Sequence, residues 1–183
     1  YDALAPRLVP YLMFMSQNNY SSDVVNTDSN SFRFSGADGK LRIDNLDRTG
    51  TVNIFTGGST AFGVGATSDK STISAYLSNA TNSRWVNFSG RAYVSTQEFI
   101  SFAYYRDLLP SVDNIVIFSG VNDLSLYFLS RYYDRQMGSF FGASDYINKM
   151  NKLQKYNFLV FLNIIFYYFD DLLLLPNFLN LLL

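Results

Sequence analysis

The sequence predicts an α/β fold in which helices cover a parallel sheet, and two observations predict it. Between residues 51 and 134, three strand-like segments alternate with three segments of helical character. Each strand-like segment ends directly in a loop of small and polar residues. Strands that alternate with helices at this spacing form parallel sheets joined by right-handed crossovers.

The first half of this region contains two predicted strands with a helix between them. Residues 52–56 form a short apolar run bounded by a Gly-Gly pair, which is typical of a buried strand. Residues 69–79 are predicted as a helix. Its apolar residues fall on one side at helical spacing: Ile73, Tyr76 and Leu77. Residues 84–88 are predicted as the second strand.

A second helix is predicted over residues 95–109. Ser95 and Glu98 have the spacing of a capping box at its start, and Pro110 stops it. Two further elements follow, a third strand and a third helix: residues 114–118 and residues 123–134.

The regions on either side differ in composition from residues 51–152, which we assign to the α/β domain. Residues 1–50 are turn-rich and polar after Met15, so we expect an irregular lead-in with one short strand at residues 31–34. No charged segment precedes an apolar run at the start, so no signal peptide is expected within the sequence. Residues 153–183 form an apolar tail.

The apolar tail has three interpretations. In residues 157–183, twenty of the 27 residues are Phe, Leu, Ile, Val or Tyr, but Asp170 and Asp171 interrupt them. The uninterrupted apolar blocks are shorter than the roughly 20 residues of a spanning helix, so we expect no membrane span. An amphipathic or buried hairpin is the second interpretation. The third is an out-of-frame translation of AT-rich DNA, which the coding sequence would settle.

Composition excludes most classes of catalytic site from being complete in this chain. It contains no histidine and no cysteine, so a Ser-His-Asp triad, a cysteine nucleophile, a zinc site of His or Cys ligands and disulfide bonds are all excluded. The 14 basic and 15 acidic residues give a net charge of -1 without a basic stripe, which argues against nucleic acid or an anionic membrane surface as the partner. We expect no cofactor and no bound metal.

Three loops at the carboxyl ends of the predicted strands carry the candidate chemistry. Parallel sheets bind ligands at this edge, so the loops that contain Ser59, residues 90–92 and Asn122 are expected to meet there. Together they offer a hydroxyl nucleophile, backbone N–H donors and a side-chain amide, which are the parts of an acyl-transfer site with an oxyanion hole. The alternative is that these small residues only form the turns between strands and helices and have no role in chemistry.

These loops resemble the conserved blocks of the SGNH (GDSL-type) hydrolases. Residues 57–63, Gly-Gly-Ser-Thr-Ala-Phe-Gly, resemble the first block in its Gly-Gly-Ser variant. Residues 87–93 resemble the second block, with Gln97-Glu98 beyond it, and residues 120–123, Gly-Val-Asn-Asp, resemble the third. The upstream stretches 8–10 and 26–33 resemble the lead-in of bacterial members, so the resemblance covers about residues 1 to 150.

The resemblance implies a fold and a role for each site residue. It implies a flavodoxin-like three-layer α/β/α sandwich that is incomplete here, and an esterase activity on a small acyl ester or an acylated saccharide. Ser59 would be the nucleophile, and its own N–H, the N–H of Ala92 and the Asn122 side chain would form the oxyanion hole. Gly90 is the other candidate for the second donor. Relatives in the bacterial cell envelope suggest an extracytoplasmic setting.

The chain departs from the family pattern at the general base. The family's Asp-x-x-His block is absent, and Asp123 is expected to cap the third helix rather than replace it. A serine without a neighbouring base is a poor nucleophile, so we expect impaired turnover. Two alternatives stay open: a non-catalytic binding module that keeps the pocket, and a fragment that is unstable because its sheet exposes edge strands.

Overall fold

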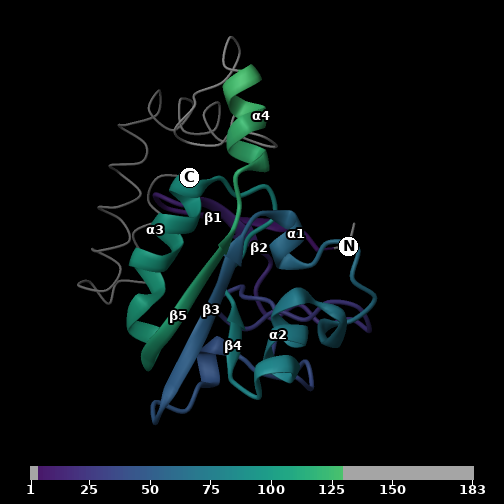
Figure 1. The fold of residues 1–183 in the computed structure, drawn as a ribbon. Helices are drawn as coiled ribbons and strands as arrows, with labels where there is room; N and C mark the ends of the chain where they lie inside the picture. Colours follow the sequence, from purple (N-terminus) through teal and green to yellow (C-terminus); the bar gives the residue numbers. More distant parts are fainter. Residues whose placement is uncertain (1–3, 130–183) are drawn as a thin grey trace, which may run out of the picture. The chain divides into compact units, whose positions relative to one another are not determined.

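The computed structural model describes residues 4–129, which form an α/β fold around a three-stranded parallel sheet (Figure 1). The strands are β3 (Thr51–Gly57), β4 (Trp85–Asn87) and β5 (Ser111–Phe118), in the order β4-β3-β5. Both pairings are parallel, which confirms the predicted class and all three predicted strands. The apolar tail and the end of the third predicted helix lie outside the described residues.

β3 lies at the centre because the chain returns to either side of it. The next strand, β4, pairs with one edge of β3, and β5 pairs with the other edge. The β3–β5 register is regular from Asn53 opposite Asn114 to Gly57 opposite Phe118. Asp113 is the extra residue at the register shift near the start of β5. The carboxyl ends of β3 and β5 are therefore adjacent, and this is the edge at which parallel sheets bind ligands.

The first predicted helix is divided in two. Residues Asp69–Ser71 form a 3-10 turn, and α2 (Ile73–Thr81) begins after Thr72, whose hydroxyl accepts a hydrogen bond from the Ala75 N–H at 3.3 Å. This cap marks the start of α2 and separates it from the 3-10 turn. The face predicted for α2 is correct for Ile73 and Leu77, which pack against the sheet, and wrong for Tyr76, which is exposed.

The second predicted helix is correct in position but shorter. α3 spans Ser95–Tyr105, and a 3-10 turn at Arg106–Leu108 completes the predicted segment. The third helix, α4 (Val121–Leu129), starts slightly before its predicted first residue. In Figure 1, α4 continues beyond the end of β5. A short helix, α1 (Ser59–Phe62), follows β3 directly and was not predicted from the sequence.

Apolar residues of β3 alternate between the two faces of the sheet. Val52 and Ile54 join the largest core cluster, which also contains Tyr105 of α3. Phe55 points the other way and packs with Ala61 and Trp85 near α2. Period-two alternation along the strand thus provides a core on each side of the sheet.

The lead-in is more ordered than expected. β1 (Pro6–Val9) and β2 (Met13–Ser16) form an antiparallel hairpin that the sequence did not predict. The short strand expected at residues 31–34 is reduced to a single bridge between Thr27 and Arg33. Lead-in side chains contribute to the largest core cluster: Val9, Leu12, Met15, Phe32 and Ile43.

Asp28 organises the turns of the lead-in. Its side chain accepts hydrogen bonds from the N–H groups of Asn30, Phe32 and Asp44 at 3.0, 2.9 and 3.1 Å. Burial raises the pKa of Asp28, and these N–H donors act against that rise. A polar segment without regular secondary structure is thereby fixed in one conformation.

None of the helices in residues 4–129 has the length and apolar character needed to cross a bilayer.

Phe88 tests the joint core of the lead-in and the sheet. Its ring is fully buried and stacks on Phe32 with the centroids 4.3 Å apart. We expect Phe88→Ala to reduce the free energy of unfolding by about 3–5 kcal/mol, measured by urea denaturation. Phe99→Ala is the matched control because Phe99 on α3 is 71 % exposed, and its effect should stay within about 0.5 kcal/mol. Equal losses for the two variants would contradict this core.

Candidate active site at the carboxyl edge of the sheet

Two glycines allow the carboxyl ends of β3 and β5 to approach each other closely. A Cβ atom on Gly57 would lie 2.1 Å from the Phe118 carbonyl oxygen. A Cβ atom on Gly58 would lie 2.8 Å from Nδ2 of Asn122. Gly57 therefore tolerates no side chain, and a side chain at Gly58 would displace the Asn122 amide, so the Gly-Gly pair brings the loop before Ser59 against Asn122, as the sequence predicted.

Ser59 is the first residue of α1 and is half-buried. Neither its hydroxyl nor its backbone N–H has a hydrogen-bond partner within residues 4–129. α1 is closed at its other end by Gly63, which adopts a left-handed conformation at φ 94° and donates to the carbonyls of Ser59 and Thr60. The Ser59 hydroxyl therefore lies at the edge of the sheet, and no basic side chain within residues 4–129 contacts it. The Ser59 N–H is unpaired within the same residues.

Asn122 is held by the second loop. Its Nδ2 donates to the Tyr93 carbonyl oxygen at 2.7 Å. A side-chain amide has two N–H bonds, so one donor of Asn122 remains for a ligand. The Tyr93 carbonyl, which sequence reasoning did not single out, thus fixes the orientation of the amide.

The second loop distinguishes its two candidate donors. The Gly90 N–H donates to the Gly57 carbonyl at 3.1 Å and is occupied. The Ala92 N–H has no hydrogen-bond partner in the described part of the chain, although Ala92 is only 9 % exposed. Ala92 adopts φ 60°, a left-handed conformation that is uncommon for alanine. The strained backbone leaves this N–H unpaired.

Tyr93 anchors the second loop to the N-terminal hairpin. Its ring lies so close to Gly90 that a Cβ atom there would be 2.3 Å from the ring carbons. Its hydroxyl donates to the Phe14 carbonyl at 3.1 Å, and the two rings meet edge to face. Burial raises the pKa of Tyr93, so the hydroxyl stays a neutral donor.

Asp123 corrects two predictions about helix caps. Its carboxylate accepts from the Ser95 N–H at 3.1 Å and from the Ser95 hydroxyl, so it caps α3 and not its own helix. The predicted capping box of Ser95 and Glu98 does not form. Instead, Gln97 Oε1 accepts from the Val94 N–H at 3.3 Å. A carboxylate from a distant segment replaced the local cap because the α3 N-terminus attracts negative charge.

Glu98 turns away from the cap and supports the third loop. The Ser119 hydroxyl donates a short hydrogen bond to its carboxyl oxygen Oε1. Burial raises the pKa of Glu98, the Ser119 hydrogen bond lowers it and the nearby Asp123 raises it. Together, Glu98 and Asp123 join α3 to Ser119 of the β5–α4 loop and to the first turn of α4, which carries Asn122.

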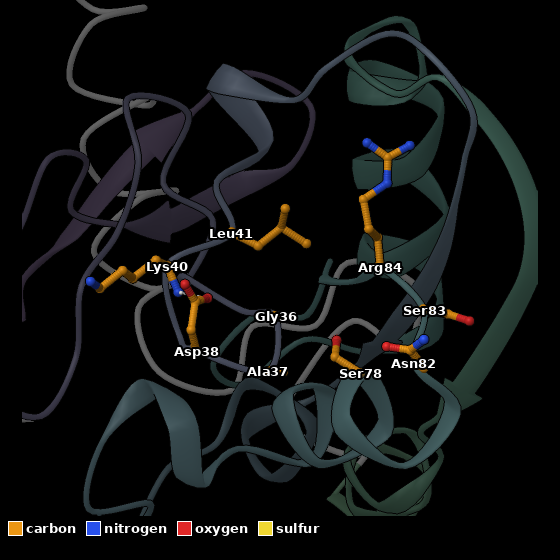
Figure 2. Close-up of a pocket in the computed structure, with 9 residues that line it drawn as sticks. All are labelled: Gly36, Ala37, Asp38, Lys40, Leu41, Ser78, Asn82, Ser83 and Arg84. Atoms are coloured by element: carbon orange, nitrogen blue, oxygen red, sulfur yellow. Dashed lines mark hydrogen bonds between the residues drawn. The ribbon is translucent and has the colours of Figure 1, made fainter.

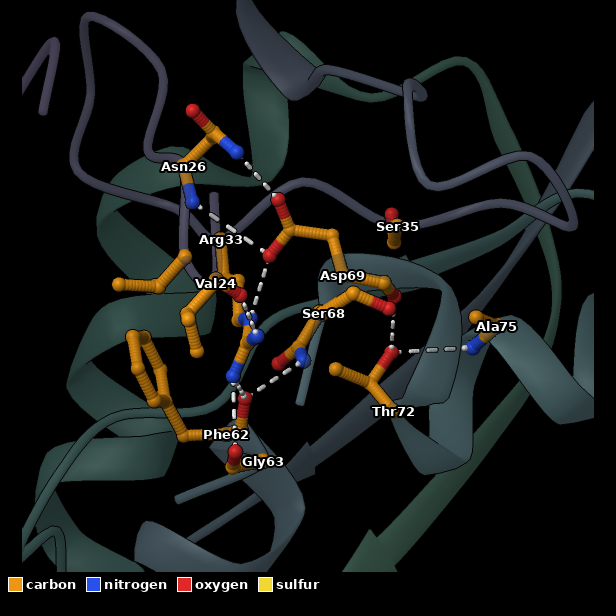
Figure 3. A network of polar contacts seen from close by, with 12 residues as sticks. Val24, Asn26, Arg33, Ser35, Phe62, Gly63, Ser68, Asp69, Thr72 and Ala75 are labelled. Atoms are coloured by element: carbon orange, nitrogen blue, oxygen red, sulfur yellow. Dashed lines mark hydrogen bonds and ion pairs between the residues drawn. The ribbon is translucent and has the colours of Figure 1, made fainter. Parts of the chain in front are cut away.

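A buried guanidinium holds the far end of α1 (Figure 3). Arg33 has no exposed side-chain surface and forms an ion pair with Asp69 through Nε at 2.7 Å. It donates to the Gly63 and Phe62 carbonyls at 2.8 and 3.3 Å and to the Val24 carbonyl at 2.7 Å. The lead-in is thereby attached to the helix that presents Ser59.

The partner of Arg33 is itself fixed by the lead-in. Asp69 also accepts from the Asn26 side chain at 2.7 Å. Asn26 and Arg33 both lie in the stretch whose family resemblance was noted, but sequence reasoning gave neither a role. The sequence gives no indication that an arginine inside a polar segment is buried, so the structural role of Arg33 is known only from the structure.

An open depression of ≈ 440 Å³ lies elsewhere and shares no residue with the candidate site (Figure 2). Its lining includes Lys40 and Arg84. The Arg84 guanidinium donates to the carbonyls of Asp47, Thr49 and Thr51, so it supports the loop before β3. Residues 4–129 also contain no group of acidic side chains arranged to hold a metal ion.

Two arginines provide a matched test of the α1 attachment. Arg33→Met leaves the Asp69 carboxylate buried without its cation, and we expect a loss of about 3–5 kcal/mol in the free energy of unfolding. Arg42→Met removes the exposed ion pair with Asp44, in which Arg42 is 42 % exposed, and should cost at most about 1 kcal/mol. Chemical denaturation of both variants measures the difference. Similar losses would mean that the buried network does not hold the lead-in.

Glu98 gives the fold a predicted pH dependence. Because its pKa is raised above the ordinary 4.5, the folded protein binds this proton more tightly than the unfolded chain. Its stabilisation is complete below pH 4.5 and is lost as the pH rises through the folded-state pKa. We expect Glu98→Gln to equal the wild type at low pH and to have a higher midpoint of thermal unfolding at about pH 7.

Asp47→Asn is the control of opposite sign. Hydrogen bonds from the Thr49 side chain and N–H lower the pKa of Asp47, so its stabilisation is present above 3.8 and disappears as the pH falls. The Asp47→Asn variant should therefore be the less stable protein at neutral pH. A difference in unfolding midpoint between the wild type and Glu98→Gln that stays constant with pH would contradict the burial assigned to Glu98.

Comparison with known protein families and with curated proteins finds no match to this chain.

Proposed function

We propose that this chain is a carboxylester hydrolase domain of the SGNH type, with Ser59 as the acyl-accepting nucleophile. One observation carries the proposal. Three hydrogen-bond donors without partners within residues 4–129 come from three loops at one sheet edge: the N–H of Ser59, the N–H of Ala92 and the second amide hydrogen of Asn122. Such a set is what an oxyanion hole requires.

The finer architecture belongs to the same proposal. A three-layer α/β/α sandwich is supported by the two core clusters, one near α2 and one near α3, on opposite faces of the sheet. The described sheet has three strands, fewer than the five or six common in open parallel sheets of this class. The SGNH resemblance in the loops therefore concerns the front part of such a sandwich.

The proposed reaction begins with attack of the Ser59 hydroxyl on the carbonyl carbon of a small acyl ester or an acylated saccharide. The carbonyl oxygen becomes an oxyanion and accepts hydrogen bonds from Ser59, Ala92 and Asn122. The alcohol then leaves, and water releases the acyl group. Because the chain contains no histidine, solvent water accepts the Ser59 hydroxyl proton and supplies the proton that the departing alkoxide takes up, so we expect slow turnover.

A second candidate function is binding without turnover. It is favoured by the Ser59 hydroxyl, which makes no hydrogen bond within the described residues, and by the absence of histidine from the sequence. In that case the three donors would hold the carbonyl or carboxylate oxygen of an acyl ligand without activating Ser59. The two functions use the same three donors and differ only in the covalent step.

Hydrolysis of p-nitrophenyl acetate tests the proposal. We expect the wild type to retain up to about 10³–10⁴-fold acceleration over water, which is the acceleration that remains in serine hydrolases when a triad member is missing. Ser59→Ala removes the nucleophile, so its rate should fall below that of the wild type, to what the oxyanion donors and binding supply without Ser59. Thr60→Ala is the matched control, since Thr60 is the adjacent exposed residue of α1 and its hydroxyl has no partner in the described chain. It should hydrolyse the ester at the wild-type rate.

Added imidazole distinguishes the two functions. An external base should raise the wild-type rate above that of Ser59→Ala at the same imidazole concentration if Ser59 is a nucleophile that lacks only its base. Asn122→Ala should then lose up to about 10²–10³-fold of the Ser59-dependent rate. Equal rates for wild type and Ser59→Ala with and without imidazole would exclude the hydrolase. Retained binding of an acyl ligand that Asn122→Ala weakens would then support the binding module.

A further inference from the structure

β5 is an edge strand with an exposed apolar surface. Within residues 4–129 it pairs with β3 alone, and seven of its eight residues are exposed. The exposed residues include four consecutive large apolar side chains: Ile115, Val116, Ile117 and Phe118. Strands of a parallel sheet are normally buried on both faces, so this surface is unusual for a free strand.

The sequence of β5 provides none of the usual protection against pairing. Natural edge strands carry lysine, proline or inward charges that prevent association. β5 contains no lysine, arginine or proline, and Asp113 is its only charge. Asp113 lies at the register shift, which ends the regular part of the strand. The remaining residues 114–118 form an uncharged, regular edge whose outer N–H and C=O groups have no partner in the described chain.

We propose that β5 pairs antiparallel with β5 of a second copy of this chain, which joins two three-stranded sheets into one of six strands. Such a pair has a two-fold axis, so one residue must lie opposite itself. Centring the axis on Val116 uses the whole regular segment. It places Ile115 opposite Ile117 and Asn114 opposite Phe118, so no charge lies opposite a like charge.

Apolar side chains flank the joined edges on both faces of the sheet. In this register Ile115 and Ile117 of the two copies meet on one face and Val116 meets its counterpart on the other, so each face gains apolar cross-strand contacts. α4, which follows β5 in the chain, also exposes apolar side chains at Val121, Leu124 and Phe128, which are 77, 56 and 73 % exposed. The competing occupant is residues 153–183 of the same chain, which are also apolar in sequence.

A single introduced cysteine tests the pairing directly, because the chain contains no cysteine of its own. Opposite residues of antiparallel strands have Cα atoms about 4.5–5.5 Å apart, within the roughly 4.4–6.8 Å range of disulfides. We expect the full-length Val116→Cys variant to form a covalent dimer under mild oxidation. Tyr76→Cys is the matched control, because Tyr76 is 62 % exposed on α2, away from β5, and it should remain monomeric on a denaturing gel.

Sedimentation equilibrium of the full-length chain supplies the second readout. The wild type should be a dimer, and Ile117→Lys should raise its dissociation constant at least about tenfold by placing a charge in the apolar interface. Tyr76→Lys should leave the constant unchanged. Circular dichroism checks that each variant is folded, and the Val116→Cys result stands alone if Ile117→Lys does not fold.

Three results would overturn the proposal. The first is a wild type that stays monomeric up to its highest soluble concentration while Val116→Cys gives no covalent dimer. The second is cross-linking of β5 to residues 153–183 of the same chain, which would show that the chain covers its own edge. The third is equal dimer formation by Val116→Cys and Tyr76→Cys, which would mean non-specific association.

Discussion

The rest of the structure depends on the buried guanidinium of Arg33. A charge without exposed surface is tolerated only where it is paired and its donors are satisfied, and Arg33 meets this condition with Asp69 and with carbonyls from two segments. Because those carbonyls belong to the lead-in and to the end of α1, satisfying the charge fixes the position of the helix that starts at Ser59. The polar lead-in is therefore structural in spite of its turn-rich composition.

The second constraint is the close approach of backbone at the carboxyl ends of β3 and β5. Gly57 contacts the Phe118 carbonyl and Gly58 contacts Asn122, so the pairing of two strands is converted into the arrangement of a site. The Tyr93 carbonyl orients the Asn122 amide, and the Gly90 N–H is bonded to Gly57. The Asn122 amide keeps one unused N–H, and the second loop keeps the Ala92 N–H unpaired within the described residues. The oxyanion site of the proposed function thus consists of the donors that stay unpaired when the other hydrogen bonds of these loops are formed.

Local patterns in the sequence predicted the elements that local physics decides. The three strands were predicted because short segments rich in β-branched and apolar residues end in turn residues, and the strand-end loops placed Ser59 and Asn122 at one edge. The remaining features depend on contacts between distant segments. The α3 cap comes from Asp123, 28 residues away from Ser95 in sequence. The N-terminal hairpin has positive φ angles at Tyr11 and Met13, and because neither residue is a glycine, the sequence did not indicate this turn.

The unprotected edge of β5 and the absence of histidine are separate properties of the chain. A parallel strand that exposes apolar side chains needs a neighbour for stability, and another copy of the chain can provide one. That copy also lacks histidine, so pairing would cover the strand without giving Ser59 a base. Burial of β5 would stabilise Ser119 and the first turn of α4, which holds Asn122, since both follow directly from this strand. Association should therefore favour the arrangement of the proposed oxyanion site, whose proposed reactivity would still depend on an external base.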